Sequence, residues 1–304
     1  MKLSTLSLAV VLVAGPVLAV AQDMDTSFQS LKDAVAKEDV ASVKKLAAEV
    51  CAMARQAAAE TAPQGEDEKK AWAERQTYAH DVETYTEYAL YAVAAKSPAA
   101  TQVDLIATLE QQNPKSKYLD QAYGLYLVAL QQTGAAAKVP TVAEKGLQNF
   151  PENEDLLMVM ADHAMNQKQT DRALGFANRL VAAASKHSKP EGMAQADYDR
   201  KKSLALGRGY WIAGVIQGER NQYAVANKDL RAALPLIQGN AAMAAPALFY
   251  LGVSNYNLGK MTNNKALVLE GAKFSDQCAA LPGPLAEQAW KNSAAMKADA
   301  AKMR

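Results

Sequence analysis

Three histidines are the first residues to examine for chemistry, because imidazole is a common acid–base group and metal ligand. His80 and His163 fall within helical patterns, and His187 falls in a loop-forming stretch. None belongs to an H-E-x-x-H motif or has a second histidine at chelating spacing. The carboxylates that follow His80 are more typical of a solvated helix face than of a site. We therefore expect no metal and no cofactor.

The two cysteines, Cys51 and Cys278, do not predict a nucleophile, because neither has a histidine in its neighbourhood. An even cysteine count in an exported protein would permit a disulfide. Both residues, however, lie in alanine-rich helical segments, where cysteine behaves as a small buried hydrophobe. The prediction is two unpaired, buried thiols.

No other motif indicates catalysis. The Gly207-Arg208-Gly209 segment lies inside a helical pattern without a preceding strand, so it does not predict a phosphate-binding loop. A G-x-S-x-G nucleophile elbow is absent from the sequence. The charged run at residues 199–202 is short and balanced in sign. We expect no catalytic residues and no enzymatic activity.

Composition narrows the class of protein further. The chain has 304 residues, of which 50% are hydrophobic and 21% charged, enough to bury a core. Aromatic residues make up only 7%, and alanine supplies much of the apolar content, which favours closely spaced helices. A net charge of +1 argues against nucleic acid or an anionic membrane as the partner.

The first 21 residues, MKLSTLSLAVVLVAGPVLAVA, have the layout of a secretory signal peptide. A basic Lys2 precedes an apolar run, and an A-x-A pattern ends at Ala21, where we expect cleavage. The alternative, a retained membrane anchor, is less favoured because the run is short and interrupted by Gly15-Pro16. The expected mature chain is exported, periplasmic if the source is a Gram-negative bacterium, and not stably inserted in a membrane.

Apolar spacing predicts an all-helical chain. Asp39 and Asn153 are expected N-caps, and Ser97 is expected to cap a helix that has Pro98 at its first position. The main predicted helices cover residues 27–37, 40–59, 67–95, 118–133, 140–149, 154–166, 171–185, 266–280 and 285–303. Residues from 195 onward are expected to extend the following helix backwards.

The long helix at residues 67–95 carries an apolar stripe that is mostly aromatic. Two interpretations stay open: the stripe fills a core against alanine-rich neighbours, which is the commoner case, or it forms a ligand-binding face. Its members are Trp72, Tyr78, Val82, Tyr85, Tyr88 and Tyr91.

Small or apolar residues recur at related positions of successive helices. Leu127 and Ala161 lie 34 residues apart, Ala161 and Gly214 lie 53 apart, and Gly214 and Gly252 lie 38 apart. The middle interval equals one repeat plus about 19 residues, which we place at residues 187–206. Small residues at fixed offsets let one helical hairpin pack closely on the next.

This pattern resembles the tetratricopeptide repeat (TPR), a helix–turn–helix unit of about 34 residues. The resemblance is clearest over residues 154–260 and weaker toward both ends. It departs from the repeat because Leu157, Tyr210 and Leu248 stand where tryptophan is preferred, so a related α-solenoid is the alternative. It implies an all-α, right-handed α-solenoid of stacked helical hairpins with divergent repeats.

The resemblance also implies a domain organisation. After the signal peptide at 1–21, we expect an N-terminal helical hairpin at 22–65 and a TPR-like array at 66–284, with the insertion around 187–206. A C-terminal capping helix at 285–304 would follow, since repeat arrays end in a polar-faced helix. Its polar face would carry Lys291, Lys297, Lys302 and Arg304.

In TPR proteins the first helix of each repeat lines a concave groove that holds a peptide or another protein. Transferred by position, the resemblance implies three sets of groove residues, although these side chains could instead pack on the next repeat. The lysine and asparagine pair that clamps a C-terminal carboxylate is absent, so the expected ligand is another protein or an internal peptide segment. The candidates are Met158, Asp162, Met165 and Asn166; Arg208, Trp211, Val215 and Glu219; and Phe249, Val253, Tyr256 and Asn257.

The sequence thus predicts an exported, non-catalytic protein-binding scaffold, with a role in cell-envelope assembly or secretion as its narrower form. That narrower form depends on a Pro-x-Ser-x-Tyr link at residues 114–118, which resembles a link in outer-membrane assembly proteins. Two alternatives stay open: an α-superhelical cell-wall enzyme or small-molecule binder, and a self-associating structural protein that forms a homo-oligomer.

Overall fold

The computed structural model describes residues 16–190 and 192–303, with the backbone alone for residues 16–22. The described chain is all-helical and contains no strand, which confirms the predicted class. Most of the predicted signal peptide, and Arg304 of the predicted polar cap, lie outside the described residues. None of the described helices has both the length and the apolarity needed to cross a membrane.

The chain divides into two compact units, Met1–Ala136 and Ala137–Arg304, which we call the N-terminal and C-terminal units. The 3₁₀ turn η1 (Ala136–Lys138) lies at the division. The described helices of the N-terminal unit are α1 (Pro16–Ala36), α2 (Val40–Ala58), α3 (Glu66–Ala94), α4 (Ala99–Gln112) and α5 (Lys117–Gln132). Those of the C-terminal unit are α6 (Val139–Asn149), α7 (Glu154–Asn166), α8 (Thr170–Lys186), α9 (Gln195–Glu219), α10 (Tyr223–Ala233), η2 (Leu234–Leu236), α11 (Ala241–Met261), α12 (Lys265–Ala279) and α13 (Ala286–Lys302).

Capping residues explain several helix starts. Asp39 accepts a hydrogen bond from the backbone N–H of Ser42, and Asn153 accepts one from that of Leu156, so both predicted N-caps are confirmed. The prediction for Ser97 was wrong. Pro98 occupies the cap position of α4 without a side-chain bond, and the Ser97 hydroxyl donates to the Val93 carbonyl of the preceding helix.

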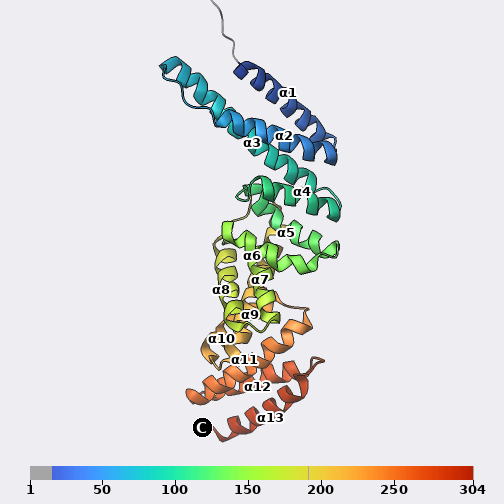
Figure 1. The fold of residues 1–304 in the computed structure, drawn as a ribbon. Helices are drawn as coiled ribbons and strands as arrows, with labels where there is room; N and C mark the ends of the chain where they lie inside the picture. The colour runs from blue at the N-terminus through green and yellow to red at the C-terminus, as the bar shows by residue number, and fades with distance from the viewer. Residues whose placement is uncertain (1–15, 191, 304) are drawn as a thin grey trace, which may run out of the picture. The chain divides into compact units, whose positions relative to one another are not determined.

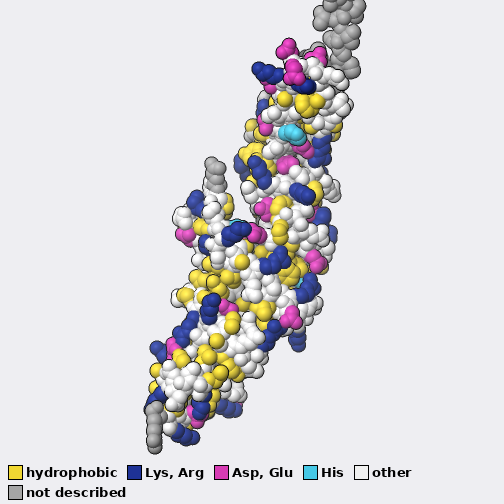
Figure 2. All heavy atoms as spheres, turned by 90° about the vertical axis from the view of Figure 1, so that its left-hand side faces the viewer, with side chains coloured by type: hydrophobic (Ala, Val, Ile, Leu, Met, Phe, Trp, Pro, Cys, Tyr) yellow, Lys and Arg dark blue, Asp and Glu magenta, His cyan; other side chains and the backbone are white. Residues whose placement is uncertain are grey.

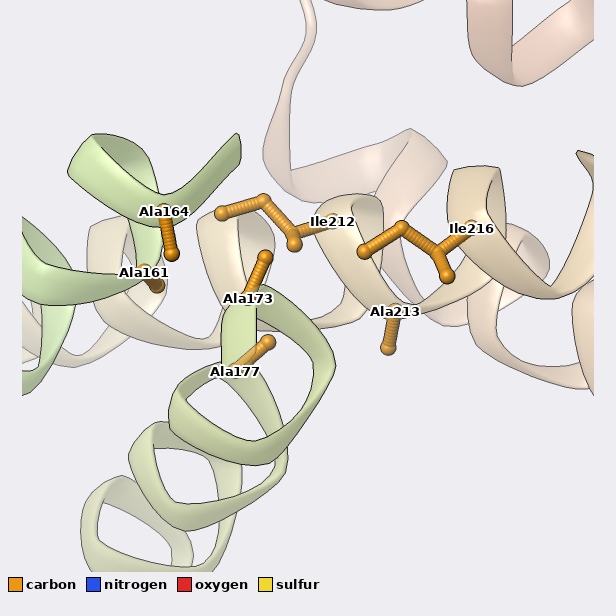
Figure 3. Packing of buried hydrophobic residues seen from close by; sticks show 7 residues of the cluster. All are labelled: Ala161, Ala164, Ala173, Ala177, Ile212, Ala213 and Ile216. Atoms are coloured by element: carbon orange, nitrogen blue, oxygen red, sulfur yellow. The ribbon is translucent and has the colours of Figure 1, made fainter. Parts of the chain in front are cut away.

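Within each unit, consecutive helices pack against one another in chain order (Figure 1). The core between α7, α8 and α9 shows how the helices pack. Ile212 and Ile216 of α9 point toward alanines of α7 and α8 (Figure 3). Ala161, Ala173 and the other members of this cluster are almost completely buried. Alanine at these positions lets three helices approach closely while the two isoleucines fill the remaining volume.

Glycines mark the closest helix contacts. A Cβ built at Gly214 of α9 would lie 2.6 Å from Cγ of Leu230 on α10, and 3.1 Å from the Leu230 backbone nitrogen. A Cβ at Gly252 of α11 would likewise meet Gly271 and Ser275 of α12. Both glycines therefore lie on packed faces, as the repeat spacing predicted.

The remaining sequence predictions on burial have mixed outcomes. Cys51 and Cys278 are buried and free, and burial raises the pKa of both thiols. The predicted polar face of α13 is only partly polar. Its Lys297 pairs with Asp276, but Trp290 on the same helix is 62% exposed.

Charges of both signs are mixed on one face of the molecule (Figure 2). On the face shown in Figure 2, basic and acidic side chains are interspersed, without a broad patch of one sign. The mixture of signs on this face agrees with the near-neutral net charge of the sequence.

Replacement of Gly214 by alanine tests the close contact between α9 and α10. The new methyl group meets the Leu230 backbone, which cannot rotate away, so we expect a loss of about 1–3 kcal/mol in the free energy of unfolding. Gly175 of α8 is the matched control, because a Cβ there meets nothing within 4 Å. Gly175→Ala should stabilise the protein by about 0.5–1 kcal/mol through helix propensity. Urea unfolding measures both, and equal effects of the two substitutions would contradict the close contact.

Two carboxylates at the contacts of α13, Asp276 and Asp299, predict that the folded protein loses stability in acid. Lys297 and Ser293 lower the pKa of Asp276, and the Tyr256 hydroxyl and Lys260 lower that of Asp299, from an ordinary value of 3.8. A lowered folded-state pKa gives stability that is present above the unfolded pKa and is lost as pH falls through the folded one.

The melting temperature should therefore drop on acidification below about pH 4, and the drop should be smaller in Asp276→Asn and Asp299→Asn. Asp67→Asn, an exposed residue at the start of α3, should keep the wild-type drop. The same acid response in all four proteins would show that these contacts do not contribute.

Candidate functional site

The predicted groove residues come from α7, α9 and α11, and the structure shows how these helices lie. Lys201 of α9 binds Asp155 of α7 at 2.7 Å, and Arg208 binds Asp162 at 2.5 Å. Both pairs join residues 46 positions apart, and the second pair lies two helical turns beyond the first. Helices α7 and α9 therefore run parallel and side by side over this length.

Helices α9 and α11 are also parallel and side by side. The Trp211 indole N–H donates to the Met243 carbonyl at 2.7 Å, across a separation of 32 residues. Gly218, two turns further along α9, faces the ring of Tyr250, which is again 32 residues later. The three helices that carry the predicted groove thus form one layer of parallel neighbours.

Four of the predicted residues come together at the centre of this layer. The guanidinium of Arg208 lies 5.0 Å from the ring centroid of Trp211, while its Nε donates to Asp162. Met165 packs against the same hydrophobic clusters as Trp211. Burial raises the pKa of Asp162, and the neighbouring Arg208 opposes that shift only in part.

Chemically, this group is suited to recognition. The half-buried Arg208 is held by an aromatic face on one side and a carboxylate on the other, so its position is defined. Neither Nη atom is bonded to a carboxylate among the described residues, and both can donate to a carbonyl or carboxylate of a partner. A guanidinium in this setting can bind a ligand but offers no acid–base chemistry.

Other predicted groove residues lie elsewhere. Val215 is 3% exposed and packs with Leu230 in the core, so its prediction as a groove residue was wrong. Met158 is half-buried against a second cluster of the same three helices, which includes Leu157 and Leu180. Asn166 and Glu219 are exposed at the ends of α7 and α9.

Two residues of the third predicted set, Phe249 and Tyr256, contact α12 or α13. Phe249 packs on a buried cluster that these two helices share with α11, and the Tyr256 hydroxyl donates to Asp299 of α13 at 2.7 Å. Asn257 donates to the Val253 carbonyl of its own helix. Phe249 and Tyr256 therefore pack against the following helices, which was the alternative to a place in the groove.

The N-terminal unit contains an aromatic surface that the sequence indicated only in part. Rings from α1, α3 and α5 contact one another in a continuous series, with successive centroids 5.2–6.4 Å apart. We call this series the aromatic row: Tyr78, Phe28, Tyr85, Tyr88, Tyr118 and Tyr91. The stripe on α3 was recognised from its spacing, but its partners Phe28 and Tyr118 lie about 50 and 30 residues away in the chain, respectively, so no local pattern connects them.

The stripe is therefore neither wholly core nor wholly surface. Val82 is buried, and the indole N–H of Trp72 donates to the Glu60 carbonyl, whereas Tyr78 and Tyr88 are each 40% exposed. An open hollow of ≈ 350 Å³ is formed by α3 and by the segment that leads into α5. Its lining residues are His80, Glu83, Thr84, Glu87, Asn113, Lys115, Ser116 and Lys117.

Both carboxylates that line the hollow contact neighbouring side chains. Glu83 is paired with Arg55, and Glu87 accepts a hydrogen bond from Asn113. Across the described residues, no group of three or more His, Cys, Asp or Glu side chains is placed to hold a metal ion. The three histidines are likewise far apart in sequence and lie on α3, on α7 and directly after α8.

Searches for similar proteins returned nothing: no protein-family model, no curated protein and no solved structure matches the chain.

Replacement of Trp211 by alanine tests its place between α9 and α11. It removes the hydrogen bond to Met243 and apolar contacts with two clusters, so we expect a loss of about 2–4 kcal/mol with helix content largely kept. Trp290→Ala is the control, because that ring is 62% exposed and should change stability by about 0.5 kcal/mol or less. Urea unfolding followed by circular dichroism measures both, and equal losses would contradict the contact.

Proposed function

We propose that this chain is a non-catalytic scaffold of the TPR-like type, a right-handed α-solenoid that binds another protein or an internal peptide segment. The observation that carries the proposal is the repeated relation between first helices, α7 beside α9 and α9 beside α11, each fixed at two points two turns apart. Helical-repeat proteins bind ligands on the surface of such a layer.

The second helices support the same proposal. Arg172 and Arg179 of α8 contact Glu144 and the Pro151 carbonyl, at α6 and just beyond it, and both pairs are 28 residues apart. In the N-terminal unit, Lys44 of α2 binds Asp104 of α4. Each unit thus has alternate helices as neighbours, the arrangement that stacked hairpins generate.

The binding face we propose lies around Arg208, Trp211, Asp162 and Met165. Aromatic residues, arginine and methionine are enriched at the energetic centres of protein interfaces. The exposed Asn166 and Glu219 would lie at the rim. An exported, envelope-associated role remains the favoured setting, on the strength of the leader sequence and the Pro-x-Ser-x-Tyr link.

The test is site-specific photo-crosslinking in cells that produce the full chain. A photoreactive phenylalanine analogue at Asn166 or Glu219 should give a discrete adduct with one envelope protein. The same analogue at Asn178, exposed on α8, serves as the control. Arg208→Lys should reduce adduct yield by about tenfold, because lysine cannot reproduce the planar guanidinium, while Arg220→Lys at the end of α9 should not.

Adducts of equal yield at Asn178, or none at Asn166 and Glu219, would overturn the proposed face.

A further inference from the structure

The hollow formed by α3 and the turn from α4 to α5 is lined entirely by polar side chains. His80, Glu83, Thr84 and Glu87 share one face of α3, because they lie at i, i+3, i+4 and i+7. The other lining residues come from the turn and from the first position of α5. A hollow of ≈ 350 Å³ has the size of a small-molecule site, and a lining without apolar side chains favours a small charged ligand.

Glu87 is the most deeply placed charged side chain of the hollow. It is 6% exposed, and its carboxylate accepts a hydrogen bond from the Asn113 amide at 2.7 Å. Among the described residues Glu87 has no ion-pair partner, because Arg55, whose charge acts on both glutamates, is bonded to Glu83 at 2.7 Å. Two glutamates thus share one arginine. A buried carboxylate without its own counter-ion is costly, so this side of the hollow favours a cation.

The turn from α4 to α5 supplies positive charge. Lys115 and Lys117 line the hollow and are exposed. Lys117 contacts the Tyr118 ring at 5.0 Å from its centroid, and neither lysine pairs with a carboxylate in the part of the chain that the structure describes. Lys117 is also the first residue of α5, and the dipole of a helix favours an anion at its N-terminus. This side of the hollow therefore favours a carboxylate.

Asn113 shows that the two sides lie close together. Its side-chain amide donates to Glu87 at 2.7 Å, and its carbonyl oxygen accepts from the backbone N–H of Lys115 at 3.0 Å. A single amide group thus spans the distance from the carboxylate to the backbone of the lysine segment. A ligand that meets both sides must carry its opposite charges within about 7 Å, the length of two extended residues.

We propose that this hollow binds a small zwitterion, an amino acid or a dipeptide, with its ammonium group at Glu87 and its carboxylate at Lys115 and Lys117. Hydrogen bonds between charged groups are the strongest that such a polar lining can make. The Thr84 hydroxyl is a further acceptor for the ammonium group. This site belongs to the N-terminal unit, whereas the protein-binding face proposed above belongs to the C-terminal unit.

The test is a titration of the full chain with glycylglycine, followed by saturation-transfer NMR. We expect a Kd of about 1 mM, because the hollow is open and the ligand is small. N-acetylglycine has nearly the same shape without the ammonium group, and glycine methylamide lacks only the carboxylate arm. Each loses one charged contact, so each should bind at least about tenfold more weakly.

Two substitutions test the two sides of the hollow. Glu87→Gln keeps the shape and the acceptor for Asn113 but removes the charge, so it should weaken glycylglycine binding by about tenfold. Lys117→Gln should weaken it by about threefold, since Lys115 remains. Glu74→Gln is the matched control, because this exposed glutamate of α3 lies outside the hollow, and it should bind like the unmodified chain. Circular dichroism checks that each variant is folded.

Three results would overturn the proposal. The first is no binding at about 20 mM glycylglycine. The second is equal binding by Glu87→Gln and the unmodified chain. The third is binding of glycine methylamide or N-acetylglycine as tight as that of glycylglycine, which would show that the hollow selects a single charge.

Discussion

Close approach between successive helices is the constraint on which the rest of this structure depends. Gly214 faces the side chain and backbone nitrogen of Leu230, and Gly252 faces Ser275 and Gly271, so at both contacts one of the two helices contributes no side chain. Alanines keep the side chains small between α7 and α8 (Figure 3). A core built this way gains its free energy from many small, well-packed contacts rather than from a few large side chains. The low aromatic content of the chain follows from that geometry.

Contacts between alternate helices then set the register. The pairs Asp155–Lys201 and Asp162–Arg208 are partly exposed, and each contributes about 0–1 kcal/mol. Both pairs join residues that are 46 positions apart, so both fit the same alignment of α7 and α9. We infer that these ion pairs determine this alignment more than they add to the free energy of unfolding. The hydrogen bond from Trp211 to Met243 does the equivalent between α9 and α11. One layer of parallel helices results, and its centre is where Arg208 is held against Trp211.

Much of the helical outline could be predicted from the sequence, because caps and apolar spacing are local signals. The caps at Asp39 and Asn153 follow from residue type. The predicted cap at Ser97 was wrong because its hydroxyl donates back to the preceding helix. Residue type does not distinguish these two hydrogen bonds, which depend on the local backbone geometry. In the candidate site, Val215 and Tyr256 could not be placed by spacing alone. Their surroundings depend on which later helix, α10 or α13, packs there. The complete aromatic row could not be predicted, because its rings come from three helices that are separated in the sequence.

Zero-length carbodiimide coupling followed by mass spectrometry tests the central claim, that alternate helices are parallel neighbours in fixed register. This reagent joins a lysine only to a carboxylate in direct contact. In the full chain we expect Lys201 to couple to Asp155 and Lys44 to Asp104, since the paired atoms lie 2.7 and 2.6 Å apart and remain partly exposed. Coupling of either lysine mainly to carboxylates of other helices would contradict the arrangement.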